Sequence, residues 1–271
     1  MQVNWLLEKE VFEENLDPLI KEIKKQGHNC QLVSYAPFKS GLYDIYDDKD
    51  CVICYGSLNL MRQLSREKKW IPGPFLNLPN YECTKYYSYF GKYLINSDYV
   101  MLPFAEFNRR KSEIFNSFSG NCFIRPSTGF KTFTGQVYNF GEWNKDLDWI
   151  KDYVTPESMI IISSAKNINT EYRFVVVNKK VITGSRYKVN GELEVTSEFT
   201  QEALLKAQEI ANEEWEPDKS YVIDIGENDN KKCYLIEINS FSCSGLYDCE
   251  LEPIVKSVSE LAMKEWKEIW E

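Results

Sequence analysis

The first third of the chain alternates short apolar runs with segments of helical periodicity. Four runs have the length of strands, and the last of them, FLNL, is expected to close the block: 4–7, 30–35, 51–56 and 75–78. Residues 15–26 place apolar side chains at helical spacing before Gly27, which is a helix stop signal. Ser57 is a candidate cap for the next helical segment. Alternating strands and helices predict a small α/β layer with a largely parallel sheet.

The remainder of the chain is richer in strands. Helical patterns at 81–94 and 105–118 flank a strand-like run at 98–104, and further helices are predicted at 200–215 and 252–270. Strands are predicted at 121–126, 131–140, 159–164, 171–178, 180–189, 221–229 and 232–240. We expect one hairpin to turn near Asn178-Lys179 and another to turn across 227–231.

Composition narrows the class of protein. Of the 271 residues, 43% are hydrophobic and 14% aromatic, which is enough for a sizeable core. No apolar run is long enough to span a membrane, and the N-terminus turns acidic too soon for a signal peptide. Eight cysteines, many in strand-like runs, indicate a reduced, cytoplasmic protein. The net charge of −9 argues against a nucleic-acid partner, and a single histidine argues against a Ser-His-Asp catalyst or a His-rich zinc site.

Two polar residues interrupt the apolar strand CYLIEINSF. Glu237 and Asn239 are two residues apart and therefore share a face, and Asp224 lies on the neighbouring predicted strand. Carboxylate and amide oxygens suit Mg²⁺, although a solvent-facing sheet edge would place polar residues in the same way. The remaining face of the strand is expected to pack the core through Tyr234, Ile236 and Ile238.

Five cations lie at strand ends or strand turns in the central region: Arg125, Lys131, Lys166, Arg173 and Arg186. Arg173 and Arg186 interrupt apolar strands, where an unpaired charge is costly. A triphosphate would supply the missing anions, whereas a salt bridge to a neighbouring Asp or Glu would explain any one of them. The loop RPSTGFKTFTG at 125–135 contains two glycines and a lysine, but it matches neither a P-loop nor a dinucleotide fingerprint.

The order FIRP, GFKTFTG, MIIISS, EYRFVVVNKKVITGSRY, VIDIG and IEIN resembles the ATP-grasp superfamily. The run EYRFVVVNKKVITGSR is similar to the corresponding run in ribosomal-protein glutamate ligases. Many relatives have Lys before Pro in the first of these motifs, and Arg125 stands there in this chain, as in an arginine-bearing branch found in phage and bacterial genomes. The hinge sequence IISSAKN also departs from the usual acidic one.

The resemblance implies an α+β ATP-grasp fold in which two subdomains clasp ATP behind a small α/β pre-grasp domain. The corresponding division is 1–79 for the pre-grasp domain and 80–271 for the ATP-grasp domain, with subdomains at about 80–165 and 166–271. It implies metal ligands Asp224, Glu237 and Asn239 for one or two Mg²⁺ ions. It also implies catalytic roles for Arg173 and Arg186, and ATP contacts from Arg125, Lys131, Ser163, Ser164, Lys166 and Glu171.

The activity implied by the resemblance is ATP-dependent ligation of a carboxylate to an amine through an acyl phosphate. The partners would be small-molecule or peptide carboxylates and amines. Two other functions remain open from the sequence. One is a phosphotransferase on the same scaffold, and the other is a nucleotide-binding module without turnover.

Overall fold

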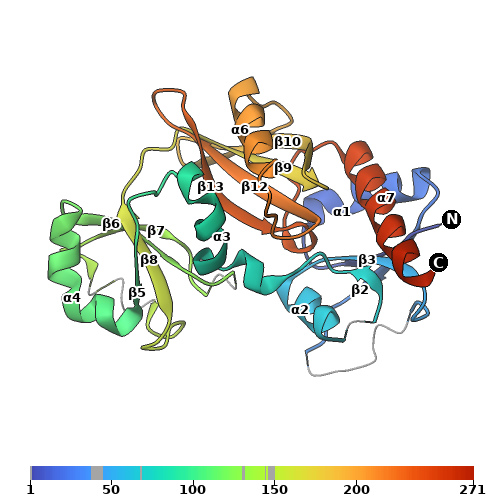
Figure 1. The fold of residues 1–271 in the computed structure, drawn as a ribbon, viewed down its shortest axis with the longest axis horizontal. Coiled ribbons are helices and arrows are strands. Elements are labelled where there is room, and N and C mark those ends of the chain that lie inside the picture. The colour runs from blue at the N-terminus through green and yellow to red at the C-terminus, as the bar shows by residue number, and fades with distance from the viewer. Residues whose placement is uncertain (1, 38–44, 68, 130–131, 144, 146–149) are drawn as a thin grey trace. The chain divides into compact units, whose positions relative to one another are not determined.

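The computed structural model of the chain describes residues 2–37, 45–67, 69–129, 132–143, 145 and 150–271. They form two compact units, one made of Met1–Asn77 with Asn169–Glu271 and the other of Leu78–Ile168. Figure 1 labels the helices and strands of both units. The division into domains at 1–79 and 80–271 stays a prediction.

Four parallel strands form the first sheet of the larger unit, in the order β2-β1-β3-β4. Helix α1 follows β1 and helix α2 follows β3, and the bounds are β1 Asn4–Glu8, α1 Glu13–Lys25, β2 Asn29–Val33, β3 Cys51–Tyr55, α2 Leu58–Glu67 and β4 Ile71–Gly73. β1 and β3 are buried along their whole length, as central parallel strands are. The predicted α/β layer is therefore confirmed. The Ser57 hydroxyl accepts the Leu60 N–H at 3.2 Å, which confirms the predicted cap of α2.

The prediction of a strand at 75–78 is wrong. The fourth strand is Ile71–Gly73, and Leu78–Tyr81 form the 3₁₀ helix η1. Phe75 is buried, but its backbone N–H donates to Ser242 Oγ at 2.9 Å and its carbonyl accepts from Ser240 Oγ at 2.6 Å. Because serine side chains satisfy these backbone groups, this apolar run is buried without joining a sheet.

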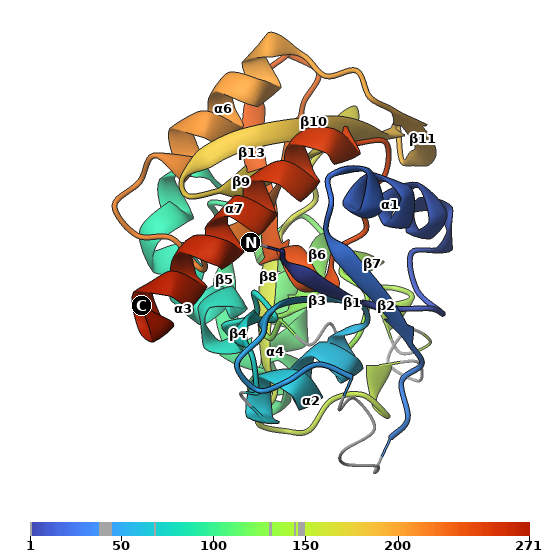
Figure 2. The same cartoon turned by 90° about the vertical axis from the view of Figure 1, so that its right-hand side faces the viewer.

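Five antiparallel strands form the second sheet of the larger unit, in the order β11-β10-β9-β12-β13. The bounds are β9 Thr170–Val177, β10 Lys180–Val189, β11 Glu192–Thr196, α6 Gln201–Ala211, β12 Ser220–Glu227, β13 Cys233–Ser240, the 3₁₀ helix η3 Phe241–Cys243 and α7 Leu251–Trp270. Figure 2 shows α6 and α7 on opposite sides of this sheet. Both predicted hairpins are confirmed, and Asn178 and Lys179 turn the first with φ of 48° and 63°.

One apolar core joins the two sheets of the larger unit. Trp5 and Ile53 from the first sheet, Val175 and Val222 from the second, and Val258 of α7 belong to the same buried cluster. All five are fully buried. The face of the second sheet that carries Val175 and Val222 is thus covered by the first sheet and by α7.

Strand β11 was not predicted, although the sequence contains a signal for it. ELEVT alternates polar and apolar residues, and Asn190 and Gly191 before it have φ of 49° and 86°, as a tight hairpin turn requires. Every residue of β11 except Thr196 is exposed. An edge strand with little burial produces only a weak hydrophobic pattern, so the Asn-Gly pair was the more informative clue.

The predicted apolar face of β13 is wrong in part. The ladder pairs Asp224 with Glu237 but Ile225 with Leu235, so Ile236 is an extra residue in a β-bulge. The bulge interrupts the alternation of side chains. Leu235 and Ile238 are therefore buried, whereas Tyr234 and Ile236 are only partly so.

The smaller unit contains an antiparallel sheet in the order β5-β8-β6-β7. Its bounds are α3 Cys83–Phe90, the 3₁₀ helix η2 Gly91–Tyr93, β5 Val100–Pro103, α4 Phe104–Ser117, β6 Asn121–Pro126, β7 Gln136–Asn139 and β8 Met159–Ser164. Ile124 and Ile162 lie on one face of this sheet and are buried with Phe107 and Phe115 of α4 and with Trp143. The sheet and α4 therefore enclose a core of their own.

None of the helices in the described part of the chain has the length and hydropathy of a membrane span. All eight cysteines are free thiols. A cytoplasmic location stays a prediction that follows from the number and placement of those cysteines.

We expect Gly184→Ala to lower the free energy of unfolding by about 1–3 kcal/mol, because a methyl group would overpack the core. A Cβ at Gly184 would lie 2.5 Å from Cε1 of Phe174, whose side chain is fully buried, and 3.2 Å from the Arg173 carbonyl. Gly91→Ala is the matched control, since a Cβ there would meet nothing within 4 Å. Urea denaturation of both variants measures the difference, and equal stabilities would contradict the packing argument.

Burial perturbs two carboxyl groups of the larger unit. Desolvation raises the pKa of Asp218 to about 6, and desolvation together with the nearby Asp218 raises the pKa of Glu265 on α7 to about 7. Asp218 also accepts the backbone N–H of Asn77 at 3.1 Å. The native state therefore binds protons that the unfolded chain, with carboxyl pKa values near 4, releases.

We expect Glu265→Gln to stabilise the protein at pH 8 relative to the wild type, but not at pH 4. A carboxyl pKa that is raised in the folded state contributes stability below the unfolded pKa, and this stability is lost as the pH rises toward 7. The amide removes that loss. Free energies of unfolding at both pH values measure it, with Glu260→Gln, an exposed change on the same helix, as the control. An effect of Glu265→Gln that does not vary with pH would refute this origin.

Candidate metal and nucleotide site

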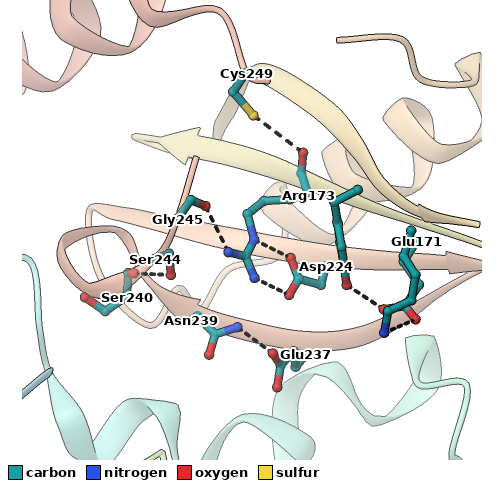
Figure 3. A network of polar contacts seen from close by, with 11 residues as sticks. Glu171, Arg173, Asp224, Glu237, Asn239, Ser240, Ser244, Gly245 and Cys249 are labelled. Carbon is teal, nitrogen blue, oxygen red and sulfur yellow. Dashed lines mark hydrogen bonds and ion pairs between the residues drawn. The ribbon is translucent and has the colours of Figure 1, made fainter. Parts of the chain in front are cut away.

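The three predicted metal ligands lie on one face of the second sheet. Asp224 on β12 pairs with Glu237 on β13 and with Arg173 on β9, so these three side chains form a row across the sheet. Asn239 lies two residues beyond Glu237 on the same face, and its Nδ2 donates to Glu237 Oε1 at 2.9 Å. Figure 3 shows the row and this hydrogen bond.

The donor chemistry of this trio fits a hard divalent cation. Asp224 is 1% exposed, whereas Glu237 and Asn239 are half-buried. Their side chains offer carboxylate and amide oxygens, which Mg²⁺ prefers. No cluster of three His, Cys, Asp or Glu side chains suited to a metal occurs among the described residues. The trio has only two carboxylates, and Mg²⁺ commonly completes its shell with water and phosphate, so this absence does not conflict with the set.

Arg173 and Asp224 form a bidentate ion pair inside the protein. Nε of Arg173 donates to Oδ1 of Asp224 at 2.8 Å, and Nη2 donates to Oδ2 at 2.7 Å. The side chains are 8% and 1% exposed. Burial opposes the charge of Arg173, but the adjacent carboxylate outweighs it and raises the pKa of the guanidinium. Removing one partner of such a pair typically costs about 3–5 kcal/mol, because the other charge is left buried and unpaired.

Two tyrosines lie against this arginine. The rings of Tyr187 and Tyr247 stack with centroids 4.7 Å apart and planes at 5°. Cζ of Arg173 lies 4.9 Å from the centroid of Tyr247 and 5.7 Å from that of Tyr187, within the range of cation–π attraction. The Tyr187 hydroxyl donates to Glu171 at 2.6 Å, and Lys188 pairs with the same carboxylate at 3.0 Å. Glu171, predicted to contact the nucleotide, thus belongs to the same polar network (Figure 3).

The structure does not bring Arg186 together with Arg173. Ser185 pairs with Arg173 across β10 and β9, and Arg186 pairs with Tyr172, so Arg186 points to the opposite face. There its Nη2 donates to Glu194 at 2.5 Å. Each arginine therefore has an anion within the chain, and charge balance alone does not require a triphosphate. The predicted catalytic roles stay predictions.

Two further candidate residues share a face of the sheet in the smaller unit. Arg125 on β6 pairs with Ile161 on β8, and Ser163 pairs with Phe123, so Arg125 and Ser163 point to the same side. Arg125 is half-buried and Ser163 fully buried. A Cβ at Gly135 would come within 2.9 Å of the Arg125 Cβ, so this glycine permits the close approach of the loop to β6.

The next candidates form a small polar cluster after β8. Ser164 Oγ donates to Asp98 Oδ2 at 2.6 Å, and Lys166 Nζ lies 2.6 Å from Ser164 Oγ and 2.9 Å from Asp98 Oδ1. Burial opposes the Asp98 carboxylate, but hydrogen bonds from Ser164 and Lys166 outweigh it and lower its pKa. Lys131, predicted to contact phosphate, lies outside the described residues.

The comparison with known families decides the family of this chain. A family described as an ATP-grasp domain, the second family of its clade, matches residues 104–257. The chain belongs to this ATP-grasp family. All of the predicted site residues lie within the matched segment, and no curated protein sequence matches the chain.

Solved structures share the ATP-grasp fold at low sequence identity. D-alanine–D-alanine ligase from Bacillus anthracis superposes with a TM-score of 0.68 at 11% identity, over 99% of each chain. D-cycloserine synthetase DcsG gives 0.66 at 10%, over 96% of this chain and 99% of the other. ATP-grasp ligase PsnB, complexed with a minimal precursor, gives 0.56 at 11%, over 97% and 100%. The ATP-grasp fold predicted from the sequence is confirmed.

Several residues of this ATP-grasp site were not predicted. Asp98, Tyr187 and Tyr247 each contact a candidate residue, and the Gly245 carbonyl accepts from Arg173 Nη1 at 2.9 Å. Tyr187 stands beside the predicted Arg186, but a tyrosine in an apolar strand ordinarily packs in a core. Nothing in the sequence distinguishes these residues, because their partners are distant along the chain.

Proposed function

We propose that this ATP-grasp protein is an ATP- and Mg²⁺-dependent ligase that joins a carboxylate to an amine, forms a C–N bond and releases ADP and phosphate. The observation that carries the proposal is the set of oxygen ligands on β12 and β13, within a segment that belongs to an ATP-grasp family. An acyl phosphate is the intermediate we propose. Two of the structures with the same fold are named as ligases, which is consistent with the proposal.

The proposed roles follow the placement of the side chains. Asp224, Glu237 and Asn239 would hold Mg²⁺, and a bound ion would neutralise phosphate charge. The proposed ATP contacts are Arg125, Lys131, Ser163, Ser164, Lys166 and Glu171. Arg186 is proposed to stabilise the transferred phosphoryl group. Its exposed ion pair with Glu194 is weak enough to exchange for a stronger anion, since exposed pairs are worth about 0–1 kcal/mol.

The demands of the reaction agree with the residues available. Phosphoryl transfer requires positioning and charge neutralisation more than a covalent catalyst. The described site residues are cations, carboxylates, amides and hydroxyls. An acyl phosphate also hydrolyses in water, so the loop 127–135 is proposed to cover the nucleotide and limit the access of water.

The substrates are proposed only as classes. D-Alanine–D-alanine ligase is named for a small amino acid, and PsnB is complexed with a precursor peptide. We therefore propose a small-molecule or peptide carboxylate and an amine. The segment 240–250, which directly follows the proposed metal ligands, is the proposed acceptor side. We also propose a cytoplasmic location.

We expect Mg·ATP to give ADP and phosphate only when both a carboxylate and an amine are supplied, with an amide detected by mass spectrometry. A screen of amino acids, short peptides and amines tests this. A phosphorylated acceptor without amide would indicate a phosphotransferase. ATP binding without any turnover would indicate a binding module, and either result would contradict the proposal.

Glu237→Ala and Asn239→Ala should each lower Mg²⁺-dependent ADP formation by at least about 100-fold and leave the fold intact, because each change removes a proposed ligand of the metal. Both side chains are half-buried, so their truncation leaves no large cavity in the core. Asp229→Asn, an exposed change in the turn of the same hairpin, is the control. Initial rates across a Mg²⁺ titration provide the measurement, and full turnover in both alanine variants would refute the metal assignment.

A further inference from the structure

The guanidinium of Arg173 is held on every side by residues of this chain. Nε and Nη2 donate to the two oxygens of Asp224, and Nη1 donates to the Gly245 carbonyl. Cζ lies near the rings of both Tyr187 and Tyr247. Only 8% of the side chain is exposed. Arg173 is thus far more constrained than Arg186, whose side chain is 29% exposed and pairs with a surface carboxylate.

The loop that contacts Arg173 is itself fixed. Tyr247 adopts φ of 51°, a left-handed conformation that is costly for a tyrosine. Its carbonyl accepts from Nδ2 of Asn15, a buried side chain of α1, at 2.7 Å. Nearby, the Ser244 hydroxyl donates to the Ser240 carbonyl at 2.6 Å. The carbonyl and the ring that contact Arg173 are therefore held in place by hydrogen bonds from α1 and within the loop.

The geometry of the ion pair determines what Asp224 can offer to a cation. A carboxylate has about four lone-pair positions, and the fork of Arg173 occupies one on each oxygen. The remaining positions lie in a plane that the guanidinium fixes. Without that partner, a carboxylate that is 1% exposed would take up a proton or rotate toward water.

We propose that Arg173 is a positioning residue, which holds the Asp224 carboxylate ionised and oriented for a divalent cation, and that it does not contact the transferred phosphoryl group. This role replaces the catalytic role expected from the sequence. It rests on the proposed function, because it takes Asp224 as a ligand of Mg²⁺. The planar fork is essential to it, since lysine has the charge but cannot bind both oxygens.

Binding of Mn²⁺ in the presence of ADP, followed by electron paramagnetic resonance, tests the proposal without turnover. Arg173→Lys and Arg173→Gln should each weaken Mn²⁺ binding about 10- to 100-fold, the usual effect of losing a partner that orients a metal ligand. Arg109→Gln is the matched control, because it removes a bidentate pair with Glu106 on the exposed surface of α4. Circular dichroism establishes that each variant is folded. If the glutamine variant does not fold, the lysine variant, which preserves the buried charge, still gives the answer.

A double-mutant cycle separates action through Asp224 from direct contact with ATP. Arg173→Lys should cause little further loss of Mn²⁺ affinity in an Asp224→Asn background, because the two residues act as one unit. Wild-type Mn²⁺ affinity in Arg173→Lys, together with a raised KM for ATP or a lowered kcat that adds to the Asp224→Asn effect, would overturn the proposal.

The same measurements distinguish this inference from the proposed function. A wild-type chain whose Mn²⁺ binding depends on Asp224 and Arg173 but which forms no amide would remove the ligase assignment and leave the inference standing. Amide formation with Mn²⁺ binding that is insensitive to Arg173 would do the reverse. Absence of Mn²⁺ binding to the wild type with ADP would overturn both.

Discussion

The buried ion pair between Arg173 and Asp224 is the constraint on which the arrangement of the candidate site depends. Two charges removed from water are tolerated only when each satisfies the other with good geometry. The pair meets this requirement with two hydrogen bonds of 2.8 and 2.7 Å between neighbouring strands. Any shift in the register of β9 against β12 would separate the partners, so the pair also penalises alternative alignments of the sheet.

The rest of the larger unit supports this register. Val175 and Val222 lie on the same face as the ion pair and are buried against the first sheet and α7. The segment after β13 is also tied to the first sheet, since the Gly56 N–H donates to the Ser242 carbonyl at 2.9 Å and the Tyr55 hydroxyl donates to the Ser244 carbonyl at 2.7 Å. The strands that carry the candidate ligands therefore share a core with residues from both ends of the chain. This common core explains why a site on β12 and β13 depends on side chains as distant in sequence as Asn15.

Local patterns predicted most of the secondary structure and failed for identifiable reasons. The parallel strands, the two hairpins and the helices that flank them follow from apolar periodicity and turn residues, which are properties of short segments. FLNL was misassigned because burial alone does not make a strand, and here serine side chains satisfy the backbone of Phe75. The bulge at Ile236 reversed the expected faces of Tyr234 and Leu235, because one extra residue shifts an alternation of period two.

The amino-acid sequence was sufficient to predict the ATP-grasp fold and the placement of Glu237 and Asn239 on one face with Asp224. These follow from ordered motifs, from alternation along a strand and from a tight hairpin, all of which are local. The folded chain was needed to show that Arg173 pairs with Asp224, that Arg186 points to the other face, and that Tyr187 stacks on Tyr247. Those contacts depend on strand register and on a loop that is anchored from α1. Periodicity along one segment contains no information about which distant segment will lie beside it.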